Sequence, residues 1–101
     1  MIQPTVGRVV LYHPGESDPE VIRFEKNPVP AIVTHVWHER MVNLVVFDAN
    51  GASRGRTSVE LHQPEDTPVL HGGFWCEWMP YQVKKPTGSE SGEKAAGAQV
   101  I

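Results

Sequence analysis

Proline and glycine divide this chain into short segments and so limit what it can fold into. The 101 residues include nine prolines and nine glycines, spread along most of the sequence. No long segment repeats apolar residues at the spacing of an amphipathic helix. Instead, short runs rich in β-branched and aromatic residues alternate with turn residues, a pattern that is typical of an all-β domain.

Five such runs predict five strands, at residues 6–12, 31–38, 41–48, 56–61 and 74–79. A long polar segment follows the first run, whereas tight connections join the middle three. One of these connections contains Asn50-Gly51, a strong hairpin signal because both residues tolerate positive φ. This order predicts a small five-stranded SH3-like barrel, with a long loop after strand 1, in which closure hides the sheet edges. An OB-type barrel is the alternative, but it usually has a helix before its last strands, and residues 62–73 show no helical pattern.

The chain changes character after the last predicted strand. From Lys84 onward the sequence is small, polar and rich in Gly and Ser, as flexible segments are. We therefore expect a single β-barrel domain at residues 1–83 and a flexible polar tail at residues 84–101. The sequence shows neither a signal-peptide pattern at its start nor an apolar run near the roughly 20 residues of a membrane span. We expect a cytoplasmic protein without membrane contact.

Composition and motifs argue against several function classes. The net charge of −3 gives no basic footprint for general DNA or RNA binding. The only cysteine, Cys76, allows no intramolecular disulfide and falls on an apolar strand face, where a buried side chain is expected. His35 and His38 are three residues apart, which places them on opposite faces of a strand and makes a poor metal site. No GxSxG, HExxH or phosphate-binding glycine loop occurs. We expect no enzyme activity, no metal and no cofactor.

The segment GGFWCEWMP, residues 72–80, combines two of the three tryptophans. Strand alternation places Phe74, Cys76 and Trp78 on one wholly apolar face, which predicts core. Trp75 then lies beside Glu77 on the outer face, an unusual position for a large aromatic ring.

Trp37 raises the same question on the second predicted strand. By alternation it shares a face with Ala31, Val33 and His35. An exposed tryptophan near Arg and His can stack on a planar ring while the cations meet phosphates. The alternatives are that these rings fill a small core or anchor a protein interface.

These considerations give a set of candidate ligand-binding residues. It comprises aromatic stackers, arginines for phosphates and histidines for hydrogen bonds: Trp37, Trp75, Arg40, Arg54, Arg56, His35 and His38. By analogy with SH3-like barrels, the long loop is a second candidate, with Tyr12, Phe24 and Trp37 lining a groove.

The segments VGRVV at residues 6–10, AIVT at 31–34 and the Gly-rich approach to the last aromatic strand resemble a group of short proteins found in bacteriophage genomes. The similarity covers roughly residues 4–80. The family's typical ending of Trp, one residue, Trp and Pro is altered here to Trp75-Cys76-Glu77-Trp78-Met79-Pro80.

A bacteriophage origin implies two function classes. The first is an oligomeric counter-defence protein that binds and sequesters a nucleotide immune signal, such as a cyclic nucleotide, in the infected cell. The second is a virion or assembly adaptor that binds other phage structural proteins. A hydrolase of such a signal is a weaker third alternative.

Overall fold

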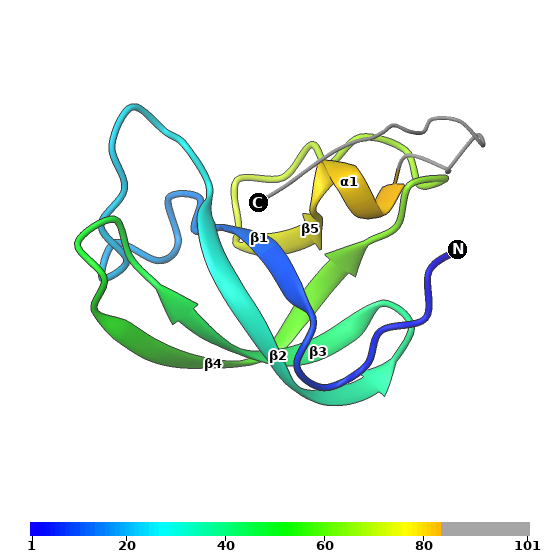
Figure 1. Cartoon of the computed structure of the whole chain (residues 1–101). Coiled ribbons are helices and arrows are strands. Elements are labelled where there is room, and N and C mark those ends of the chain that lie inside the picture. Colours follow the sequence, from blue (N-terminus) through cyan, green and yellow to red (C-terminus); the bar gives the residue numbers. More distant parts are fainter. Residues whose placement is uncertain (84–101) are drawn as a thin grey trace, which may run out of the picture.

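The structure is a computed structural model that describes residues 1–83, and these form a closed barrel of five strands (Figure 1). The strands are β1 (Val9–His13), β2 (Val29–His38), β3 (Met41–Phe47), β4 (Ser53–His62) and β5 (Trp75–Trp78). The predicted flexible tail at residues 84–101 lies outside the described residues. Within residues 1–83, no helix has the length and apolar character needed to cross a membrane.

The strands pair in sequence order, and β1 also pairs with β5 to close the barrel. All pairs are antiparallel except that of β4 with β5, where Leu61 lies opposite Cys76 and His62 opposite Glu77. A parallel pair between consecutive strands requires a crossover connection, which residues 63–74 supply without a helix. The prediction of an all-β, five-stranded SH3-like barrel is confirmed.

Strand alternation places the core inside the barrel. The buried apolar side chains include Val10 and Tyr12 of β1 and Val42, Leu44 and Val46 of β3. The other side chains of β3 are only partly buried, although the run from Leu44 to Phe47 is apolar on both faces of the strand. The reason is that the barrel wall is a single sheet, so the outer side of each strand meets solvent.

Two strands begin three residues away from the expected position, and the other boundaries differ by at most two residues. β1 begins at Val9 rather than residue 6, because residues 5–8 form a turn in which Gly7 has a φ of 96° and the Arg8 N–H donates to Thr5 O at 3.2 Å. β4 begins at Ser53, three residues early, because its first part pairs with the end of β3. A short helix, α1 (Pro80–Val83), was not predicted. It starts at a proline, whose fixed φ suits the first helical position.

Candidate functional site

The last part of β2 exposes a histidine and a tryptophan because the strand is irregular. Ala31 and Val33 face the core and are fully buried. The register with β3 then shifts between Val33 and His35, and the inward position passes to Val36, which packs against the core. A bulge adds one residue and so reverses the alternation of faces. His35 and Trp37, expected on the face of Ala31 and Val33, lie instead on the outer face.

Trp37 is exposed but oriented. The side chain is 57% exposed, and its Nε1–H donates to Asn43 Oδ1 on β3 at 2.9 Å. The same oxygen accepts the backbone N–H of Ser58 on β4 at 2.8 Å. The ring of His35 meets that of Trp37 edge-on, with centroids 4.6 Å apart. The hydrogen bond to Asn43 and the contact with His35 therefore fix the orientation of the indole, while more than half of its surface stays open to solvent.

β4 contributes Ser58 to the surroundings of this tryptophan, through the shared contact with Asn43. Ser58 has a positive φ of 54°, close to a register shift between β3 and β4. We refer to His35, Trp37, Asn43 and Ser58 as the outer-face site.

Trp75 is less open than Trp37. It lies on the outer side of β5, where the ring of His13 stacks on it with centroids 4.0 Å apart and planes 4° apart. The ring of His62 meets that of Trp75 edge-on, with centroids 5.5 Å apart. His13 is itself held by Glu77, with 2.6 Å between Nε2 and Oε2. One face of the Trp75 ring is thus already occupied by the protein.

Trp78 and Cys76 face the core, as expected. Trp78 is 2% exposed and Cys76 is fully buried. Burial raises the pKa of the Cys76 thiol well above its usual value, so the reactive thiolate is disfavoured. The inward-facing residues Cys76 and Trp78 of the segment at residues 72–80 therefore stabilise the fold.

Arg56 holds the long loop between β1 and β2. It binds Asp18 through two hydrogen bonds, Nε to Oδ2 at 2.7 Å and Nη2 to Oδ1 at 2.9 Å, and it also contacts Glu20 at 3.0 Å. The Tyr12 hydroxyl donates to Asp18 Oδ2 at 2.6 Å. The hydrogen bonds from Arg56 keep the pKa of the Asp18 carboxyl below its usual value. Burial, with the bond to Asp18, raises the pKa of Tyr12.

The placement of Tyr12 corrects one expectation. Its side chain is fully buried beneath the loop, so it does not line a groove with Phe24 and Trp37, both of which are exposed.

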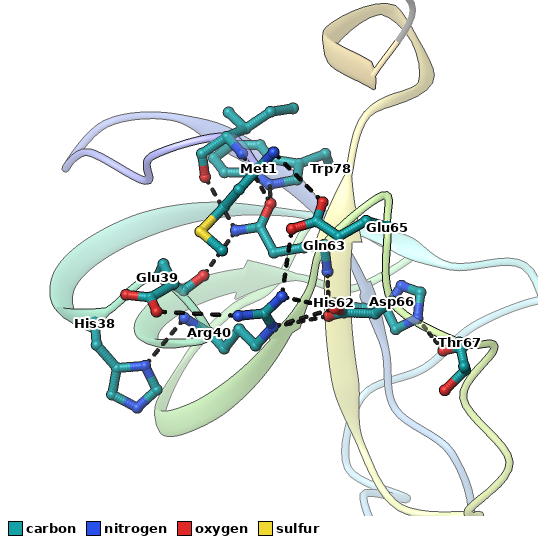
Figure 2. Close-up of polar contacts among 11 residues, drawn as sticks. Met1, His38, Glu39, Arg40, His62, Gln63, Glu65, Asp66, Thr67 and Trp78 are labelled. Atoms are coloured by element: carbon teal, nitrogen blue, oxygen red, sulfur yellow. Dashed lines mark hydrogen bonds and ion pairs between the residues drawn. The ribbon is translucent and has the colours of Figure 1, made fainter.

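Arg40 is held by carboxylates near the other end of β4 (Figure 2). Its Nε donates to Asp66 Oδ2 at 3.0 Å and its Nη2 to Asp66 Oδ1 at 2.7 Å. Asp66 also accepts the backbone N–H of Gln63 at 2.9 Å. The hydrogen bonds from Arg40, followed by that from Gln63, lower the pKa of Asp66 to about 2. Glu65 adds a further contact to Arg40 Nη2 at 3.4 Å.

Gln63 is a buried polar centre beside this ion pair (Figure 2). Its Oε1 accepts the Ile2 N–H at 3.0 Å and the Trp78 Nε1–H at 3.2 Å. Its Nε2 donates to Ile2 O at 3.0 Å and to Glu39 O at 2.7 Å. The amide thus joins the first residues of the chain, the β2–β3 turn and β5, and all of its polar atoms are hydrogen-bonded.

An open pocket of about 500 Å³ adjoins Arg40 and Asp66. The outward side chains of β4 and the loop at residues 66–71 line it. His71 accepts the Gly73 N–H on Nδ1, so its Nε2 carries the proton that bonds Glu60 at 3.1 Å. Charged groups around this pocket are therefore largely paired with one another. No group of three His, Cys, Asp or Glu side chains within residues 1–83 is arranged to hold a metal ion.

The predicted ligand-binding residues fall into separate places. His35 and Trp37 are in contact on β2, and His38 accepts the Arg40 N–H at 3.1 Å where β2 ends. Arg54 and Arg56 lie toward the other end of β4, paired with β3 at Val46 and Leu44. Trp75 lies on β5 with His13 and His62.

Sequence reasoning missed Asn43 and Ser58. An asparagine inside an apolar strand was the one available signal, because such a residue normally has a specific hydrogen-bonding partner.

Comparisons with known proteins add no family. No protein-family model, no curated protein and no solved structure matches the chain. The resemblance to bacteriophage proteins stays a prediction.

Proposed function

We propose that this protein is a non-enzymatic binding protein that takes a planar ring of its ligand on the outer-face site. The observation that supports this most strongly is that Trp37 is 57% exposed and yet fixed by its hydrogen bond to Asn43. An oriented indole loses little conformational freedom when a second ring stacks on it. Stacking of a base on an aromatic side chain contributes about 1–3 kcal/mol to binding.

The ligand that we propose is a nucleotide-type molecule, with its base on Trp37. His35 and His38 are the nearby hydrogen-bonding side chains. Among the predicted arginines, Arg40 and Arg56 already bind carboxylates, so an incoming phosphate would have to compete with them. Arg54 is exposed and is not ion-paired within residues 1–83, but it pairs with Val46 toward the other end of β4, away from Trp37. It would therefore meet a phosphate that is remote from the stacked base, as in an oligonucleotide-type ligand. In its most specific form, the proposal is an oligomeric counter-defence protein that sequesters a nucleotide immune signal and releases it unchanged.

The test is a titration of the purified protein with a panel of cyclic di- and oligonucleotides, followed by tryptophan fluorescence. We expect saturable quenching in the wild type. In Trp37→Ala, where the reporting ring is gone and the affinity is measured by calorimetry, binding should weaken by about five- to 150-fold, which is the contribution of one stacked base. Trp75→Ala is the matched control and should bind nearly as the wild type does, because His13 already covers one face of that ring.

An unchanged affinity in Trp37→Ala would show that the outer-face site is not where the ligand binds. Ligand recovered by heating should be intact, whereas a cleaved product would favour the hydrolase alternative.

One observation favours the second candidate, a phage virion or assembly adaptor. Phe24, in the loop after β1, is 59% exposed and is followed by Glu25 and Lys26 with φ values of 57° and 62°. Left-handed backbone at two successive non-glycine residues is strained, and such strain concentrates at functional segments. An exposed aromatic ring there suits a protein contact. Co-purification of phage structural proteins that is lost in Phe24→Ser, and kept in Trp37→Ala, would favour this function over the first.

A further inference from the structure

The two polar atoms of the Asn43 side-chain amide differ in their hydrogen bonding. Its Oδ1 accepts hydrogen bonds from Trp37 Nε1 at 2.9 Å and from Ser58 N at 2.8 Å. Among the residues that the structure describes, its Nδ2 donates to no acceptor. Both bonding groups are N–H donors and require an oxygen, which fixes the orientation of the amide. The amino group is therefore held as an open donor.

We propose that Asn43 Nδ2 reads the edge of the ligand ring that stacks on Trp37, an inference that rests on the proposed function of the outer-face site. Nδ2 and Oδ1 share one carbon atom, so the amino group borders the Nε1 edge of the indole. It consequently borders a ring that covers the indole. No sequence motif marks Asn43 for this role, because its position depends on the register of β2 with β3.

The chemistry of the amino group defines the class of ligand. It offers two N–H donors and no acceptor, so it favours a ring whose edge carries a carbonyl oxygen or an unprotonated ring nitrogen. A purine with adjacent O6 and N7 acceptors has such an edge. A ring that presents a donor at this edge would leave two donors facing each other. Asn43 therefore selects among bases, whereas Trp37 accepts any of them.

The deciding variant is Asn43→Asp. Its carboxylate still accepts from Trp37 Nε1 and Ser58 N, but it places an oxygen where the amino group was. The probe is inosine, a neutral nucleoside whose base carries O6 and N7. Its affinity for every variant is measured by isothermal titration calorimetry, and in the proteins that keep Trp37 the indole N–H resonance of this residue in NMR spectra locates the binding. Thr34→Asp is the matched control, because it adds the same charge at an exposed position next to His35 without touching Asn43.

We expect Asn43→Asp to weaken inosine binding by about tenfold, through loss of a hydrogen bond and the facing of two acceptors. Thr34→Asp should change the affinity by less than about twofold, because an exposed charge has little effect on a neutral ligand. The unliganded indole resonance of Asn43→Asp should stay hydrogen-bonded, which verifies that the site is still formed.

Any other outcome overturns the role of Asn43, either alone or together with the proposed function. Wild-type affinity in Asn43→Asp, together with lost binding in Trp37→Ala, overturns the role of Asn43 and leaves the proposed function standing. Equal weakening in Asn43→Asp and Thr34→Asp assigns the effect to charge and also overturns it. If inosine does not shift the wild-type resonance, or if Trp37→Ala binds as well as the wild type does, the ring-binding function and the role of Asn43 fail together.

Discussion

Two tryptophans in this barrel use the same hydrogen bond in opposite surroundings. Trp78 donates its indole N–H to the Gln63 side-chain oxygen at 3.2 Å, and Trp37 donates to that of Asn43 at 2.9 Å. Trp78 is 2% exposed and Gln63 is fully buried, whereas Trp37 is 57% exposed. The same pair of chemical groups thus lies once in the core and once on the outer wall.

The amino groups of the two amides show what the difference means. That of Gln63 donates to two backbone carbonyl oxygens, Ile2 O and Glu39 O, so the buried amide is fully hydrogen-bonded. That of Asn43 donates to none within the described residues. A buried polar group must satisfy every donor because water cannot reach it, whereas an exposed one can keep a donor for a ligand. The first pair therefore stabilises the fold and the second is available for recognition.

The largest expected difference between the two sites is the loss of stability when each tryptophan ring is truncated to alanine. Trp78→Ala should lower the free energy of unfolding by about 3–5 kcal/mol, since it removes a large buried side chain from the core. Trp37→Ala should cost less than about 1 kcal/mol, because more than half of its surface stays exposed to water in the folded protein. Urea denaturation of the two variants measures both. Similar losses would mean that Trp37 is a structural residue.

Removal of the amides should give the next largest contrast. Gln63→Leu leaves the Trp78 N–H and two backbone carbonyls without their partner in the interior, for an expected loss of about 2–4 kcal/mol. Asn43→Leu should cost about 1 kcal/mol or less, because the exposed Trp37 N–H can bond water instead. Chemical denaturation again provides the measurement. A larger loss in Asn43→Leu than in Gln63→Leu would contradict the division into a structural and a recognition amide.

The smallest expected effect is a loss of stability in acid, which should begin at the ion pair of Arg40 with Asp66 beside Gln63. The pKa of Asp66 falls from 3.8 to about 2 on folding, so the unfolded chain binds this proton more readily than the folded one does. The stabilisation is therefore complete above about pH 4 and is lost as the pH falls toward 2. Urea midpoints measured between pH 5 and pH 2 should decline, and Asp66→Asn should flatten part of that decline. Asp18, whose pKa is also lowered, accounts for some of the remainder. An Asp66→Asn profile parallel to that of the wild type would contradict the ion pair with Arg40.

Much of the fold followed from local sequence patterns. Turn residues divided the chain into five strands, and the long and short connections between them predicted the order of the barrel. Simple alternation placed Cys76 and Trp78 inward on β5, a strand too short to contain an irregularity. Pattern reasoning works at such positions because the two-residue repeat of a strand is a property of its own backbone.

The site depended on contacts between segments far apart in the sequence. Arg56 and Asp18 are 38 residues apart, and neither the ion pair nor its effect on the loop follows from the residues near either one. On β2 the sequence determined that a tryptophan and a histidine occur together, but a bulge decided that both face outward. Bulges and register are set by the pairing energy of neighbouring strands and by the closure of the barrel, which no single strand encodes. Composition therefore supplied an indole and an amide to each site, and only the tertiary structure decided which amide was fully bonded and which kept an open donor.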